Sequence, residues 1–193
     1  MKYFFLFTAL LCFGFAQGQF TTSVYWTEKS TLPVADVIYY NPAVPLTWKD
    51  FKGKPVATSR AAAITASGFG YKASIENKGS KGQLKIGVYC YFNKNNSWVK
   101  DGKTSAYILS HEQNHFNISY LAAQMFVDKL NAASFTNSNY NVILPRIYNE
   151  VVDVMNKMQT DYDGQTKNGQ VKEMQYKWDD FLGKKIGVLT SSQ

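Results

Sequence analysis

The sequence predicts a single α+β domain in which an N-terminal antiparallel sheet is followed by a long helix and two further helices. Two patterns predict this class. Apolar residues alternate with polar ones through much of residues 61–93, as in half-buried strands, and from Thr104 onward they recur every three or four residues, as along a helix. A chain in which the strands precede the helices favours a fold with the sheet and the helices in separate layers. A chain of 193 residues with 45% hydrophobic content can bury one ordinary core, so we expect one domain.

The first 18 residues have the pattern of a secretory signal peptide. Lys2 supplies a positive charge, residues 3–15 form an apolar run too short to span a membrane, and Ala16 or Gly18 suits cleavage. We therefore expect residues 19–193 to form the mature domain of a secreted, periplasmic or cell-envelope protein without a membrane span; an N-terminal anchor is the alternative. Cys90 is the one cysteine of this domain, so we expect a small buried side chain and no intramolecular disulfide.

The formal net charge of +7 does not by itself indicate a nucleic-acid-binding protein. The lysines are scattered along the chain rather than clustered, and no nucleic-acid-binding motif is present. A basic, solvated surface is the better interpretation, and we expect no nucleic-acid partner. The sequence leaves the oligomeric state open.

Four segments precede the long helix. Residues 19–29, which are polar and aromatic, are expected to form a first strand or an ordered arm. Residues 46–55 indicate a short element that brings Trp48 and Phe51 to the core and ends in a glycine and proline turn. Two strands follow, at 61–76 and 83–93, and the segment between them is typical of a hairpin. The second strand should bury the face made of Leu84, Ile86, Val88, Cys90 and Phe92.

Three helices are expected in the second half of the chain. The first is long, begins after Thr104 as its N-cap, and turns an apolar face inward as far as Leu130. The second runs from about Pro145 to Met158, since proline is accepted in a first helical turn. We expect a turn at 161–164, and then a third, weaker helix over about residues 171–182.

The long helix carries the residues with the clearest chemistry, His111, Glu112 and His115, in the sequence His-Glu-Gln-Asn-His. A step of four residues projects both imidazoles from one face, where they can bind one cation. In zinc peptidases with this spacing the metal acidifies a water molecule and the glutamate is the general base. We therefore expect a zinc-dependent peptidase with Glu112 as general base. Coincidence is the alternative, since two histidines fall four apart in about one such chain in a hundred.

The third metal ligand is not fixed by this motif. Both histidines of the chain are already used, and Ile118 and Ala122 occupy the later positions of the extended HExxHxxGxxH pattern. Asp128 shares the helix but lies about 20 Å along it from His115. The remaining candidates are four carboxylates further along the chain: Glu150, Asp153, Asp161 and Asp163.

Four segments carry a resemblance to a known family: 48–55 (WKDFKGKP), 97–99 (SWV), 109–118 (LSHEQNHFNI) and 162–169 (YDGQTKNG). Through them the chain resembles the bacterial family known as domain of unknown function number 922, which is described as predicted secreted zinc-dependent proteases. The resemblance spans most of the mature chain, and its third segment is the most specific. It implies a zincin-like fold, a zinc cofactor, metallopeptidase activity and a peptide or protein substrate.

The chain departs from this family at one position of the last segment. The family's motif, YDxxTxHG, has a histidine where this chain has Asn168, and it keeps the aspartate that is Asp163 here. We therefore expect Asp163 as the third metal ligand or as its support, with Asn168 as a poorer, neutral candidate. The alternative function is a non-catalytic envelope or surface binding protein on a zincin scaffold that has lost its site.

Overall fold

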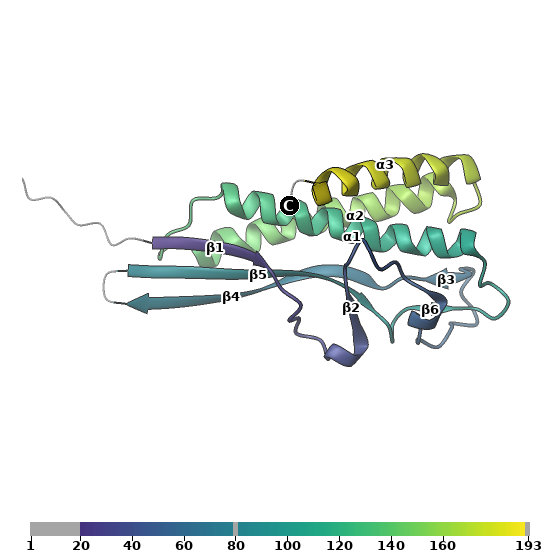
Figure 1. Cartoon of the computed structure of the whole chain (residues 1–193), viewed down its shortest axis with the longest axis horizontal. Coiled ribbons are helices and arrows are strands. Elements are labelled where there is room, and N and C mark those ends of the chain that lie inside the picture. The colour runs from purple at the N-terminus through teal and green to yellow at the C-terminus, as the bar shows by residue number, and fades with distance from the viewer. Residues whose placement is uncertain (1–19, 79–80, 192–193) are drawn as a thin grey trace, which may run out of the picture.

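The computed structural model describes residues 20–78 and 81–191, which form a sheet on one side and three helices on the other (Figure 1). The predicted α+β class is confirmed. The expected signal peptide, residues 1–18, lies outside the described residues, as do residues 79 and 80 in the predicted hairpin connection. None of the helices in the described part of the chain is both long enough and apolar enough to cross a bilayer.

β5 (Lys81–Asn93) is the central strand of the main sheet. β4 (Ser67–Lys78) pairs with it in antiparallel fashion along one side, which confirms the predicted pairing. The first strand, predicted from residue 61, begins only at Ser67, because Ala63 and Ile64 pair with a different segment. On the other side, β1 (Phe20–Trp26) runs parallel to the first part of β5, and β2 (Val37–Tyr39) runs antiparallel to its end. The expected antiparallel sheet is therefore a mixed one. Residues 27–80 separate β1 from β5, so no tight turn fixes their relative direction.

A second sheet has two short antiparallel strands, β3 (Ala63–Ile64) and β6 (Trp98–Val99). Two 3₁₀ helices, η1 (Val34–Asp36) and η2 (Trp48–Asp50), lie in the connections before it. Phe51, directly after η2, is buried against Phe92 with ring centroids 5.0 Å apart, and Trp48 packs on Phe51 at 4.9 Å. The predicted contact of this segment with the core is thus confirmed.

The three helices differ from the expected ones at their ends. α1 (Ala106–Ala132) begins after Ser105 rather than Thr104, because the Ser105 hydroxyl accepts a hydrogen bond from the backbone N–H of Ile108 at 3.2 Å. α2 (Tyr140–Thr166) and α3 (Lys172–Ser191) are both longer than the periodicity indicates. The additional residues of α2 include those that complete the candidate site.

The predicted turn at 161–164 is wrong, because these residues form part of the last turns of α2. Tyr162 and Thr166, which are one helical step apart, both have 0% exposure, so packing on neighbouring helices outweighs the weak helix propensity of Gly164. The chain turns instead at Lys167, Asn168 and Gly169, with φ of 49°, 53° and 77°.

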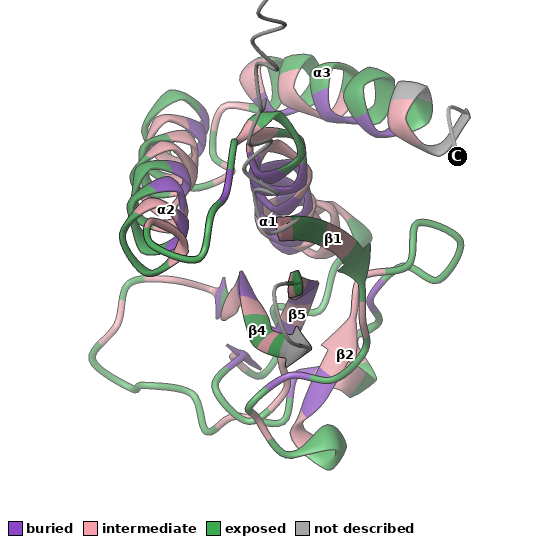
Figure 2. Ribbon diagram, turned by 90° about the vertical axis from the view of Figure 1, so that its left-hand side faces the viewer, coloured by how far each residue is buried: buried purple, intermediate pink, exposed green. Residues whose placement is uncertain are grey.

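The core lies between the sheet and α1. The predicted inward face of β5 is buried, and it forms one cluster with fully buried side chains of α1 such as Ile118 and Phe126. Burial raises the pKa of the Cys90 thiol, which fits its expected role as a small apolar side chain. Figure 2 shows α1 enclosed by the sheet, α2 and α3. The His-Glu-Gln-Asn-His segment therefore lies on the central helix of the molecule.

Candidate metal centre

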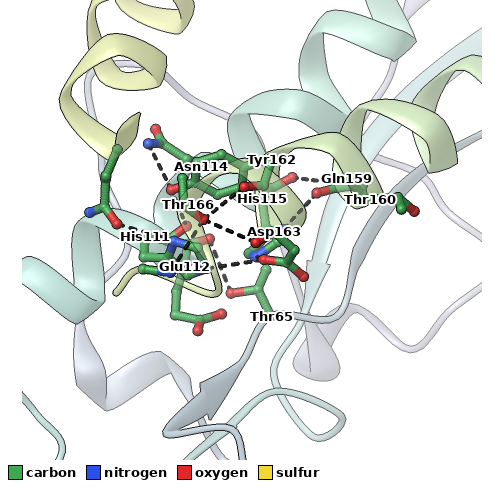
Figure 3. A network of polar contacts seen from close by, with 12 residues as sticks. Thr65, His111, Glu112, Asn114, His115, Gln159, Thr160, Tyr162, Asp163 and Thr166 are labelled. Atoms are coloured by element: carbon green, nitrogen blue, oxygen red, sulfur yellow. Dashed lines mark hydrogen bonds and ion pairs between the residues drawn. The ribbon is translucent and has the colours of Figure 1, made fainter. Parts of the chain in front are cut away.

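His111 and His115 of α1 and Asp163 of α2 turn toward one another where the two helices meet (Figure 3). The Nε2 atoms of both histidines lie 3.2 Å from the same atom, Oδ1 of Asp163. The three donor atoms are all within 4.8 Å of one another. The structure thus brings both predicted histidine ligands and one candidate carboxylate into a group that could hold a metal ion.

The other candidate ligands do not join this group. Glu150 and Asp161 each form an ion pair with a nearby lysine, at 2.8 and 2.6 Å, and Asp153 is exposed. Asn168 lines the same cleft, but its residue is exposed and its side chain is not a carboxylate. Of the five candidates, Asp163 is the one that the fold brings to the histidines.

Two of the three distances between the donor atoms match the spacing of ligands around a small cation with tetrahedral coordination. Zinc lies about 2.0–2.2 Å from imidazole nitrogen and carboxylate oxygen, so two ligands of a tetrahedral zinc are about 3.3 Å apart. The two Nε2 to Oδ1 distances, 3.2 Å each, fit this separation. The side chain of Asp163 is 41% exposed, so the group is open to solvent on one side. Two imidazoles, one carboxylate and an open side are the donor set of a catalytic rather than a structural zinc site.

Two glutamines orient the histidine rings. The amide nitrogen of Gln159 donates to the carbonyl of His115 at 2.9 Å, and that of Gln175 donates to the carbonyl of Tyr107 at 3.2 Å. Each amide oxygen therefore faces a ring Nδ1, at 2.6 Å in His115 and 3.2 Å in His111, and must accept its N–H. In a neutral ring Nε2 then carries its lone pair toward the shared focus, as a metal ligand requires, whereas a protonated ring donates its Nε2–H to Asp163.

Tyr162 packs the rings from behind. Its own ring stacks on His111 with centroids 4.6 Å apart and meets His115 edge-on at 5.1 Å. The Tyr162 hydroxyl accepts a hydrogen bond from Asn114 at 3.2 Å and donates to the His111 carbonyl at 3.4 Å. Burial raises the pKa of Tyr162, so this hydroxyl keeps its proton. The rings are thus fixed by packing as well as by hydrogen bonds.

Gly169 closes the turn after α2 against the same site. Its φ of 77° is in the left-handed region, where glycine has no steric penalty. A Cβ at this position would lie 3.4 Å from Nδ1 of His111 and from the amide oxygen of Gln175, and the Gly169 carbonyl accepts the Tyr107 hydroxyl at 2.6 Å. The turn therefore sits directly on the hydrogen bond that orients His111.

Glu112 is a buried carboxylate beside the three-residue group. The residue is 4% exposed, and its Oε2 has no hydrogen-bond partner among the described residues. Burial raises its pKa, while the neighbouring histidines and Thr65 partly offset this effect. A buried carboxylate oxygen without a partner is costly in a folded protein. Glu112 lines the same cleft as the histidines, so this buried carboxylate borders the space where a molecule would bind.

The charges within the group are strongly coupled. Burial alone would raise the pKa of Asp163, but hydrogen bonds and charge interactions with His111 and His115 outweigh it and hold the pKa well below its usual value. Burial alone would lower the pKa of His115, but Asp163 and Glu112 outweigh it and raise the pKa. The site is therefore one that favours positive charge at its focus, whether from protons or from a cation.

A cleft of about 1100 Å³ opens over the group. One wall is the segment 59–65, which includes the two residues of β3, and the other walls come from α1, the end of α2 and the turn after it. His111, Glu112, His115 and Asp163 all line it. A cleft of this size admits several residues of a peptide.

Comparisons with protein-family models, curated proteins and solved structures give no match for this chain. The resemblance to the zinc-dependent protease family thus stays a prediction, and a function has to be argued from the site itself. Sequence reasoning missed Gln159 and Gln175. Gln159 stands four residues before Asp163, the same step that separates the histidines, and that spacing on α2 is a signal that could have identified it.

Proposed function

We propose that the chain is an exported zinc-dependent peptidase, in which His111, His115 and Asp163 hold the metal and Glu112 is the general base. One observation carries the proposal. Two imidazole nitrogens lie 3.2 Å from one carboxylate oxygen, and Glu112, whose buried carboxylate has one oxygen without a partner among the described residues, lines the same cleft. A purely structural metal site would not need that carboxylate, whereas hydrolysis does.

The donor set fits zinc, which supplies Lewis acidity when bound by polarising a carbonyl and lowering the pKa of water. Glu112 accepts a proton from a water molecule in the cleft and later passes it to the departing amine. The raised pKa of Glu112 helps the first of these transfers, because a carboxylate with a higher pKa is a stronger base than an exposed one. Gln159 and Gln175 keep the histidine rings in place meanwhile.

β3 offers an edge along which an extended substrate can lie. Among the described residues β6 is the one strand that pairs with it, and residues 61–65 line the cleft. The Thr65 hydroxyl donates to the backbone carbonyl of Glu112 at 3.1 Å, so this segment ends beside the general base. We propose that a peptide adds to the free edge as a further strand, with the bond to be cleaved next to Glu112.

The binding-protein alternative depends on Asn168, which stands where the resembled family has a histidine. Asp163 provides a third donor atom without that histidine, and it does so at a distance that suits zinc. This supports the peptidase over a scaffold that has lost its site.

Metal content and hydrolysis, measured on one preparation of the chain without residues 1–18, test the proposal. We expect about one zinc per chain and cleavage of unstructured protein or peptide substrates. Glu112→Gln should keep the zinc and lose about 10²–10⁴-fold of the hydrolysis rate, the usual contribution of a general base. Glu150→Gln, which changes an exposed glutamate of α2, is the matched control and should keep both. A protein that binds no zinc, or full cleavage by Glu112→Gln, would contradict the proposal.

A further inference from the structure

The cleft has one basic end and one uncharged end. Arg60 and Lys103 line it, both are exposed, and neither has an ion pair among the described residues. Beyond His115, the cleft is lined by side chains without charge: Ser67, Met155, Asn156 and Gln159. The positive charges are therefore concentrated in one part of the substrate path.

Backbone contacts hold the two basic residues at the same end. The N–H of Lys100 donates to the carbonyl of Ala62 at 2.9 Å, and the Lys100 ammonium donates to the carbonyl of Ser59. Lys103 belongs to the same turn, because its N–H donates to the carbonyl of Lys100 at 3.1 Å. Asp101 lies in this turn too, but it does not line the cleft. Arg60 and Lys103 thus both line the part of the cleft that is formed by the segments preceding α1.

The chain direction of β3 determines which side of the cleaved peptide bond lies at the basic end of the cleft. The segment runs from Arg60 to Thr65, whose hydroxyl donates to the backbone carbonyl of Glu112. It bends at Ala62 and is a strand only at Ala63 and Ile64, so its five steps cover at most about 16 Å. A peptide that pairs antiparallel with the segment runs the opposite way. Its residues after the cleaved bond then lie toward Arg60, and those about three to five positions downstream reach the basic end.

We propose that Arg60 and Lys103 select peptides that carry a carboxylate about three to five residues downstream of the cleaved bond. This specificity rests on the proposed peptidase function. The carboxylate belongs either to an Asp or Glu side chain or to the C-terminus of the peptide. Because both basic groups are exposed, each ion pair contributes about 1.4- to 5-fold, or about 2- to 25-fold for the pair, and the effect weakens in high salt.

Quenched peptides that differ only in Glu, Gln or Lys at these downstream positions test the proposal. We expect the zinc-loaded wild type to cleave the Glu peptide with a kcat/KM about 2- to 25-fold above the Gln peptide, and the Lys peptide more slowly still. Arg60→Glu/Lys103→Glu should invert this order. Lys52→Glu/Lys54→Glu makes the same charge change on exposed lysines outside the cleft and should leave the order unchanged.

Two further arms complete the test. Peptides that end at these positions with a free or an amidated C-terminus separate a terminal carboxylate from a side-chain one. Fluorescence anisotropy of labelled peptides on the same proteins measures binding without turnover, so charge-dependent binding in the absence of cleavage would refute the peptidase and keep the basic subsite. Equal kcat/KM and equal binding for Glu, Gln and Lys peptides, or a preference for Glu upstream of the cleaved bond, would overturn the proposal.

Discussion

Replacing Asp163 by asparagine should remove most of the stabilisation that zinc gives to the folded chain. Zinc at a free concentration of 100 Kd stabilises the native state by about 2.7 kcal/mol, and 1 kcal/mol raises Tm by about 2–4 °C for a chain of this size. The wild type should therefore melt about 5–11 °C higher with zinc than after chelation.

The expected loss follows from the position of the Asp163 carboxylate. Its Oδ1 is one of three donor atoms and lies 3.2 Å from both of the others. A change to a residue that only orients a metal ligand already lowers the affinity for the metal about 10- to 100-fold. Loss of the charged ligand itself should therefore lower the zinc affinity at least about 100-fold. At the same zinc concentration only about 0.4 kcal/mol of stabilisation remains, which corresponds to a shift of about 1–2 °C.

Thermal melting with and without zinc, together with zinc affinity from competition with a chromophoric chelator, measures this prediction. Asp161→Asn is the matched control, because Asp161 lies two residues earlier on α2 and pairs with Lys157 at the surface. It should keep the full zinc-induced shift. If Asp163→Asn keeps that shift, or if Asp161→Asn loses it, Asp163 is not the third ligand and the geometric argument fails.

Three further predictions concern the surroundings of the group. Gln159→Ala and Gln175→Ala should each weaken zinc binding about 10- to 100-fold in the chelator competition, because the ring Nδ1 loses its acceptor; unchanged affinity would contradict the orienting role. Gly169→Ala should lower the free energy of unfolding by about 1 kcal/mol in urea titration and weaken zinc binding too, because its φ is 77° and its Cβ would crowd His111; an unaltered protein would contradict this. After chelation, Asp163 stabilises the fold above about pH 4 and loses this effect as pH falls, while His115 stabilises it below about pH 6.5 and loses this effect as pH rises through its raised pKa. The Tm difference between the chelated wild type and Asp163→Asn should therefore be largest between about pH 4 and 6.5, and a difference that is flat with pH would contradict the coupling.

Local sequence patterns were sufficient to predict an element whose structure is determined by its own residues. The alternation in β5 and the three-to-four period of α1 predicted both elements, because one buried face repeats along each. The end of α2 could not be predicted in the same way. Asp-Tyr-Asp-Gly favours a turn locally, but Tyr162 is buried by contacts with residues far away in the chain, such as His111. The direction of β1 was likewise set by its distant partner β5 rather than by its own residues.

In the candidate site too, local spacing was predictable from the sequence and long-range packing was not. The spacing of His111 and His115 is local, so the sequence predicted that both rings share one face. Spacing alone left Asp163 as one of several carboxylates, and the family resemblance singled it out; the packing of α2 on α1 is what brings it to the histidines. Gln175 carries no local signal at all, because it reaches His111 from a third helix.

The metal group joins residues that are far apart in the sequence, and this gives a bound ion a second consequence. His111 and Asp163 are 52 positions apart, and Cys90, the cysteine in the described part of the chain, is free, so no disulfide holds distant segments together there. An ion held by both residues closes a loop of that length, and a disulfide over such a loop would stabilise the fold by about 4 kcal/mol through the entropy of the unfolded chain. A metal centre here would therefore act as a removable cross-link between helices as well as a place for chemistry, and chelation should expose the second half of the chain to proteolysis before the first.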